Sequence, residues 1–174
     1  LGEPSRNHTA PCVAYTTYRI QAMNPDATFI VTPADAIVLD EDVFVDDVTN
    51  AVDFASKNDA LLTLGIKPTS PHTGYGYINF DKKEAAKGIH KVHRFTEKPD
   101  SETAKSFVKS GDYVWNAGIF IWSVKSVVNA LKENATELYE KFEGGKEHFN
   151  TENEIPFINK MYPTTPKISI DYAL

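Results

Sequence analysis

The sequence contains little cysteine and no long apolar segment. Cys12 is the only cysteine among 174 residues. An internal disulfide is therefore excluded, and a reducing, cytoplasmic location is expected. No run of about 18 apolar residues is present, so we expect no membrane span. The first residues are neither basic nor apolar, which argues against a secretory leader. Because the first residue is not Met, we expect the natural N-terminus to lie upstream.

Basic residues are also in the minority. Lys and Arg number 18 against 24 Asp and Glu, which gives a net charge of −6. Nucleic acid is not expected as a partner, because a phosphate backbone requires clustered cations. A small phosphorylated ligand remains compatible with this balance, since it needs only one or two local cations. Hydrophobic residues make up 41% of the chain, which is enough to form the core of one domain or one lobe of a larger domain.

The apolar residues follow an alternating strand and helix pattern. Residues 27–32 and 60–66 are short apolar runs, which predict strands buried on both faces of a parallel sheet. Helical spacing over residues 42–57 joins them into a crossover unit. Residues 75–80 and 88–96 predict an antiparallel insertion, joined by a charged connection over residues 81–87. Further helices are predicted at 9–23, with Thr9 as N-cap, and at 101–110, 123–142 and 154–161, and further strands at 114–122 and 167–170. The fold class is α/β with a mostly parallel sheet.

Two carboxylates lie beside apolar runs and are candidates for metal binding. Asp35 follows the first predicted strand, where open α/β sheets bind ligands. Asp171 follows Ile168 and Ile170 near the end of the chain. A carboxylate is a hard oxygen ligand that suits Mg²⁺ held partly by substrate phosphates. A turn or helix cap is the alternative role for Asp35, and the sequence does not show that the two carboxylates meet.

Three other short segments carry polar groups that could bind a sugar phosphate. Glu97 and Lys98 end a predicted strand; Glu can accept two sugar hydroxyls and Lys can hold a phosphate. Neighbouring strand residues face opposite ways, so this pair need not interact. Gly74 and Gly76 would let the backbone approach a ligand, although turns explain most such glycines. Asn116 lies inside an apolar strand and must find hydrogen-bond partners, either a sugar hydroxyl or a backbone carbonyl.

Six motifs in order resemble the bacterial mannose-1-phosphate guanylyltransferase family across nearly the whole chain. In sequence order they are Glu3-Pro4 with Thr9-Ala10-Pro11, Thr32-Pro33-Ala34-Asp35, Gly65-Ile66-Lys67-Pro68-Thr69 with Thr73-Gly74-Tyr75-Gly76-Tyr77-Ile78, Phe95-Thr96-Glu97-Lys98-Pro99, Trp115-Asn116-Ala117-Gly118-Ile119-Phe120, and Ile168-Ser169-Ile170-Asp171-Tyr172-Ala173. Each motif is only moderately specific, and the order of all six is the stronger signal.

The resemblance implies a Rossmann-like nucleotide-diphospho-sugar transferase fold. The implied reaction is attack of mannose 1-phosphate on the α-phosphate of GTP, with Mg²⁺ as cofactor. The implied catalytic residues are Asp35, Lys98 and Asp171, with Asp35 and Asp171 as metal ligands. The implied substrate-binding residues are Gly74, Tyr75, Gly76, Glu97, Lys98, Asn116 and Gly118. The implied nucleotide-binding residues are Glu3, Pro4, Thr9, Pro33 and Asp35.

The sequence departs from the family in ways that limit these expectations. The glycine-rich, basic loop that cradles the triphosphate is absent, Asn7-His8 stands where a basic residue and Asn are usual, and Ala36 replaces a usual His. Residues 1–174 are therefore expected to be a partial catalytic domain, truncated at both ends and inactive by itself. A homodimer contact would belong to a later C-terminal region. The alternatives are a relative that uses another sugar or base, and a catalytically dead regulatory subunit.

Overall fold

The computed structural model describes residues 2–174, which divide into two compact units. The first unit comprises the residues up to Phe29, Val52–Leu61 and Trp122–Leu174, and the second comprises Ile30–Ala51 and Leu62–Ile121. The boundary passes through four elements, which are strand β1 (Thr28–Val31), helix α2 (Glu41–Lys57), strand β2 (Leu61–Ile66) and strand β5 (Tyr113–Ser123). Each unit is therefore assembled from segments that are distant in the sequence.

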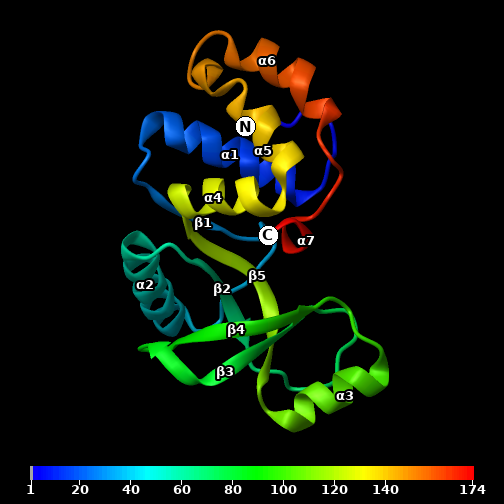
Figure 1. The fold of residues 1–174 in the computed structure, drawn as a ribbon. Helices are drawn as coiled ribbons and strands as arrows, with labels where there is room; N and C mark the ends of the chain where they lie inside the picture. Colours follow the sequence, from blue (N-terminus) through cyan, green and yellow to red (C-terminus); the bar gives the residue numbers. More distant parts are fainter. Residues whose placement is uncertain (1) are drawn as a thin grey trace. The chain divides into compact units, whose positions relative to one another are not determined.

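The first unit is helical and has an aromatic core. Helix α1 (Thr9–Met23) packs against α4 (Val124–Asn134) and α5 (Thr136–Glu143), as Figure 1 shows. The later elements of this unit are η1 (Lys146–His148), α6 (Glu154–Met161), η2 (Tyr162–Thr164) and α7 (Ile170–Ala173). The aromatic rings at the centre of this unit are Tyr15, Tyr18, Phe142, Phe149 and Tyr162. All five side chains are buried, so they supply much of the apolar area that this unit removes from water.

Both ends of the described chain are tied together within this first unit. The N–H of Ala10 donates to Ile168 O (3.1 Å), and the N–H of Ile170 donates to Thr9 Oγ1 (2.8 Å). Thr9 therefore satisfies a free donor at the start of α7, whereas His8 occupies the N-cap position of its own helix. Two predictions are corrected here, because Thr9 is not the N-cap of α1 and the predicted strand at 167–170 is wrong.

The second unit contains the antiparallel part of the sheet. Strand β3 (Tyr77–Ala86) pairs with β4 (Ile89–Thr96) and with β5, and both pairings are antiparallel. The strand order is β1-β5-β3-β4, and β2 also pairs with β5. Helix α3 (Ser101–Ser110) lies between β4 and β5 in the sequence, and its N-cap Asp100 accepts from Thr103 N (2.8 Å). The predicted antiparallel insertion is thus confirmed, whereas a mostly parallel sheet is not.

Strand lengths and burial differ from the prediction in two further respects. Residues 81–86, four of which are charged, extend β3. The turn is confined to Lys87 and Gly88, and Gly88 has φ 68°. A left-handed glycine allows this tight reversal without a long connection. Strands β1 and β2 are only partly buried, with Ile30 43% and Ile66 53% exposed. Within residues 2–174, no helix combines the length and apolar character needed to cross a membrane.

Candidate functional site

Three of the predicted sugar-binding residues lie level with one another across adjacent strands, two of them just outside β3 and β4 and the third within β5. In the β3–β4 register Tyr77 faces Thr96, and in the β3–β5 register Tyr77 faces Trp115. The residues one step beyond these positions are Gly76, Glu97 and Asn116. Antiparallel pairing therefore brings together three motifs that are far apart in the sequence, and it does so inside the second unit.

The contacts among these three residues are close. The N–H of Asn116 donates to Gly76 O (2.8 Å), which ties the residue before β3 to β5. A Cβ on the buried Gly76 would lie 2.7 Å from Glu97 Oε2 and 2.8 Å from Phe95 Cζ. Because real Cβ atoms do not come so close to other atoms, only glycine fits beside the Glu97 carboxylate in this arrangement. Glycine is therefore favoured at position 76, because a side chain there would collide with Glu97 and Phe95.

Glu97 and Lys98 form an ion pair, which strand alternation by itself does not require. Lys98 Nζ lies 3.1 Å from Glu97 Oε1. The physical reason is that Lys98 has left the strand and adopts a left-handed conformation with φ 44°. Its side chain is 64% exposed, whereas that of Glu97 is 22% exposed. The site therefore presents a half-buried carboxylate beside an accessible cation.

The Asn116 side chain is held by two groups that flank it. Its Oδ1 accepts from Gly118 N (3.1 Å) and from the Thr63 hydroxyl (3.1 Å). Gly118 has φ 68°, which directs its N–H back toward the Asn116 side chain and favours glycine at that position. The sequence analysis did not identify Thr63 as a partner of Asn116, because threonine is common in strands for its β-branched shape alone.

Aromatic rings lie beside the predicted sugar-binding residues. Tyr75 stacks on His72, with ring centroids 4.2 Å apart, and meets Trp115 edge-on at 5.0 Å. His72 Nδ1 accepts from Gly74 N (3.0 Å), and His72 O accepts from the Tyr77 hydroxyl (2.9 Å). His72 was also missed, and its role is to order the turn that carries Gly74 and Tyr75.

The predicted metal ligands belong to different units. Asp35 lies in an exposed turn of the second unit, where no cation of the described residues pairs with its carboxylate. Asp171 is in the first turn of α7 in the first unit. Pro33, predicted to lie near the guanine, is 3.5 Å from the position that a Cβ on Gly118 would occupy. Pro33 therefore lies beside Gly118, two residues after Asn116. The Mg²⁺ site that Asp35 and Asp171 were predicted to share stays a prediction. Within residues 2–174, no group of three or more His, Cys, Asp or Glu is arranged to hold a metal.

The remaining predicted nucleotide-binding residues, Glu3, Pro4 and Thr9, lie in the first unit. The Tyr162 hydroxyl donates to the Glu3 carboxylate. Burial raises the pKa of the Cys12 thiol, and nearby Glu3 adds to this shift. Asn7, considered as a departure at the guanine site, is buried, and its Nδ2 donates to Tyr162 O (3.0 Å) and Thr165 Oγ1 (2.9 Å). Asn7 is thus a structural tie in this unit.

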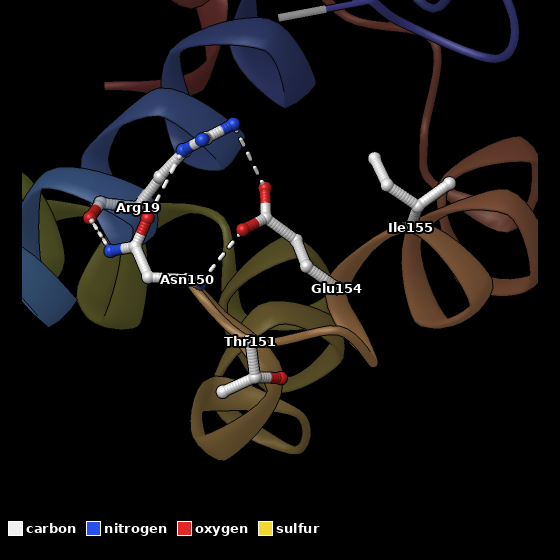
Figure 2. A pocket seen from close by; sticks show the side chains of 5 residues that line it. All are labelled: Arg19, Asn150, Thr151, Glu154 and Ile155. Carbon is white, nitrogen blue, oxygen red and sulfur yellow. Dashed lines mark hydrogen bonds and ion pairs between the residues drawn. The ribbon is translucent and has the colours of Figure 1, made fainter.

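A separate pocket of about 310 Å³ lies in the first unit and is shown in Figure 2. The buried Glu154 accepts from the Tyr15 hydroxyl (2.7 Å) and from Asn150 N (2.7 Å), and it pairs with Arg19 at 3.2 Å. Arg19 also donates to Asn150 Oδ1. These charges satisfy one another, and none of the predicted site residues lines the pocket. We therefore assign this network to the stability of the unit.

The second unit brings a carboxylate, a cation, an amide and two glycines close together across three strands. The nucleotidyl transferase family matches residues 1–160, and the chain belongs to that family.

More specific similarity is to a mannose-1-phosphate guanylyltransferase and to an alginate biosynthesis protein. The chain is 37% identical to mannose-1-phosphate guanylyltransferase RfbM of Salmonella typhimurium strain LT2, over 99% of this chain and 36% of that protein. It is 31% identical to the alginate biosynthesis protein AlgA of Pseudomonas aeruginosa, over 100% of this chain and 36% of that protein. The chain thus spans just over a third of the length of these relatives. The family resemblance expected from the six motifs is confirmed.

Solved structures show the same fold. A crystal structure described as mannose-1-phosphate geranyltransferase from Thermus thermophilus superposes with a TM-score of 0.86 and 28% identity, covering all of this chain and 48% of the other. A mannose-6-phosphate isomerase structure from Helicobacter pylori gives a TM-score of 0.78 and 26% identity, covering 99% of this chain and 65% of the other. The predicted nucleotidyltransferase-like α/β fold is therefore confirmed.

Proposed function

We propose that this chain carries the sugar-phosphate site of a mannose-1-phosphate guanylyltransferase. In the proposed reaction an oxygen of the mannose 1-phosphate group attacks the α-phosphate of GTP. A bond forms between that oxygen and the α-phosphorus, the bond to the β-phosphate oxygen breaks, and pyrophosphate leaves. Such transfer depends on positioning and charge neutralisation and needs no enzyme nucleophile.

The observation that carries the proposal is the level register of Gly76, Glu97 and Asn116 across three strands. Glu97 can accept sugar hydroxyls from a half-buried position. Lys98, one residue further, can hold the phosphate as a point charge. Gly76, between Glu97 and Asn116, has no side chain that would displace the Glu97 carboxylate. The three strands therefore bring close together polar groups that can bind a monosaccharide phosphate.

Mg²⁺ is the proposed cofactor, with Asp35 as its proposed ligand in the second unit. The Asp35 carboxylate is exposed and makes no ion pair with a cation of the described residues, which suits a hard oxygen ligand. When bound, Mg²⁺ would neutralise charge on the phosphates of the reacting nucleotide. Pro33, beside Gly118, would border the nucleotide.

The proposal is tested by calorimetric titration of the 174-residue chain with α-D-mannose 1-phosphate in the presence of Mg²⁺. We expect binding that weakens at least tenfold in Lys98→Ala, because the variant loses a charged hydrogen bond worth about 1.5–3 kcal/mol. The matched control is Lys91→Ala, an exposed lysine on the neighbouring strand β4. Its affinity should equal that of the unmodified chain.

Substrate choice is read from the same titration with glucose 1-phosphate, which differs in the orientation of one hydroxyl. Tighter binding of the mannose compound supports the proposal. Equal binding of the two would favour a related enzyme for another sugar. No binding of either, or full binding by Lys98→Ala, would refute this assignment of the site.

A further inference from the structure

We propose that the turn carrying Tyr75 is closed only while His72 is uncharged, so that His72 makes ligand binding at this site sensitive to pH. The turn comprises residues 72–76 and lies immediately before strand β3. It carries three of the predicted substrate-binding residues, Gly74, Tyr75 and Gly76. This inference rests on the proposed function, because it concerns the affinity of the same site. It gives a role to a residue that lies outside all six motifs.

The ring of His72 closes the turn as a hydrogen-bond acceptor. The N–H of Gly74 donates to His72 Nδ1 across 3.0 Å. A backbone N–H can only donate, so Nδ1 must carry a lone pair, and the proton of the neutral ring belongs to Nε2. A Cβ on Gly74 would lie 2.8 Å from His72 Cε1 and 3.1 Å from Nδ1. The ring and the Gly74 backbone are therefore in close, direct contact.

Protonation of His72 removes this acceptor. In a charged histidine both ring nitrogens carry protons, so Nδ1 would face the Gly74 N–H as a second donor. A half turn of the ring would place a carbon there instead, which accepts no hydrogen bond. His72 is exposed, so a proton can reach the ring while the unit stays folded. Histidine is also the side chain that ordinarily changes charge between pH 5 and 8, which brings this conflict close to neutral pH.

The groups around His72 do not replace the lost hydrogen bond. The titratable groups that contact His72 are the phenols of Tyr75 and Tyr77. Within residues 2–174, no carboxylate forms an ion pair with the His72 ring. The charged groups of the site, Glu97 and Lys98, pair with each other. Charging of His72 is therefore not offset by a partner that would hold the ring in its present place.

The part of the turn that protonation would release is short, because both of its ends are held by other hydrogen bonds. The Tyr77 hydroxyl donates to His72 O (2.9 Å). The N–H of Asn116 donates to Gly76 O (2.8 Å). Neither bond involves the His72 ring. The residues between the two ends would move, and Tyr75 would lose the ring on which it stacks at a centroid distance of 4.2 Å.

The inference is tested by calorimetry at several pH values with the unmodified chain and His72→Asn. The asparagine oxygen can accept from the N–H two residues on, as in an Asx turn, but it does not titrate. The variant lacks the ring, so its affinity for α-D-mannose 1-phosphate should be lower at every pH. The ligand phosphate gains a proton at about pH 6, which weakens binding by both chains. Between about pH 7.5 and about pH 5.5, we expect the affinity of the unmodified chain to fall about three- to tenfold more than that of His72→Asn, as for one lost hydrogen bond.

Two further variants separate the acceptor from the ring. His72→Phe keeps a ring that can stack on Tyr75 and removes the acceptor. At about pH 7.5 it should bind about three- to tenfold more weakly than the unmodified chain, and it should show the pH dependence of His72→Asn. The matched control is His93→Asn, which changes a half-exposed histidine on β4. It should keep the pH dependence of the unmodified chain.

Nuclear magnetic resonance of the chain without ligand distinguishes a failure of this inference from a failure of the proposed function. The Gly74 amide proton should lose protection from exchange as the His72 ring titrates, and in His72→Asn it should not respond over the same interval. Parallel pH profiles of affinity in the unmodified chain and His72→Asn, or a Gly74 amide that ignores the titration of His72, would overturn the inference. No binding at any pH, with a Gly74 amide that still follows the His72 ring, would instead refute the proposed function.

Discussion

The substitution Gly76→Ala tests the close approach at the centre of the site. The new Cβ would lie 2.7 Å from Glu97 Oε2 and 2.8 Å from Phe95 Cζ, whereas ordinary contact begins at 3.4 Å. Both neighbours must therefore move by about 0.6–0.7 Å. The Glu97 carboxylate can rotate away at small cost because it ends a flexible side chain. The resulting loss of stability should be about 1–2 kcal/mol.

Binding should also weaken, by a free energy comparable to the loss of stability. A displacement approaching 1 Å of a group that orients the substrate can cost on the order of 100-fold. We expect the affinity for mannose 1-phosphate to fall about 10- to 100-fold, measured by calorimetry. For a chain of this length, each 1 kcal/mol lowers Tm by about 2–4 °C. Thermal unfolding followed by circular dichroism should therefore show only a modest decrease.

Gly111→Ala is the matched control. Gly111 ends helix α3 with φ 69° and has no atom within 4 Å of the position that a Cβ would take. Alanine there adds about 1–2 kcal/mol of backbone strain without touching the site. This variant should lose stability to a similar extent and keep its affinity. If Gly76→Ala binds as well as Gly111→Ala, the argument from close approach is wrong.

Three other contacts give expectations that can be measured. Asn7→Ala leaves buried acceptors without their donor, so the free energy of unfolding should fall by about 2–4 kcal/mol in urea titrations. The control Asn58→Ala changes an exposed side chain and should alter the free energy of unfolding by less than about 0.5 kcal/mol. Burial, assisted by the hydrogen bond to Glu154, raises the pKa of Tyr15 from 10.0 to about 12. The contribution of Tyr15 to the free energy of unfolding is therefore complete below pH 10 and is lost as pH rises toward 12. In Tyr15→Phe the free energy of unfolding should decline less steeply over that interval, and an equally steep decline would contradict this. Glycine at position 98 relieves the strain of the left-handed backbone, so Lys98→Gly should be about 1 kcal/mol more stable than Lys98→Ala. Both variants should bind mannose 1-phosphate equally poorly. Equal stability of the two variants would show that the backbone at this position is not strained.

The sequence predicted the positions of most helices and strands but not how the strands pair. Hydrophobic spacing located α1, α2, α3 and β5 to within a few residues, since local periodicity reflects which face is buried. Pairing direction depends on contacts between distant segments, which spacing does not encode. The apolar strand β1 therefore suggested a parallel, doubly buried arrangement, whereas the registers that define the site are antiparallel.

The candidate site was predicted residue by residue from motifs, and the structure added its geometry. Gly76, Glu97 and Asn116 meet because of strand register, which no single motif reveals. The Glu97–Lys98 pair was missed because a left-handed lysine is uncommon, and strand alternation places adjacent side chains on opposite faces. Thr63 and His72 act through hydrogen bonds to other site residues, and such supporting roles leave no periodic signal in the sequence.

The hydrogen bonds that join Thr9 and Ala10 to Ile168 and Ile170 also bear on how the chain is synthesised. They link residues about 160 positions apart, so the helical unit has high contact order and a large loop-closure cost. Its N-terminal helix leaves the ribosome long before its last partners exist. We therefore expect the uninterrupted β2–β5 region to become compact first. Helix α1 should expose its apolar face, and be most accessible to a chaperone, until α4 and α5 have been translated, and part of that face should stay exposed until α7 follows.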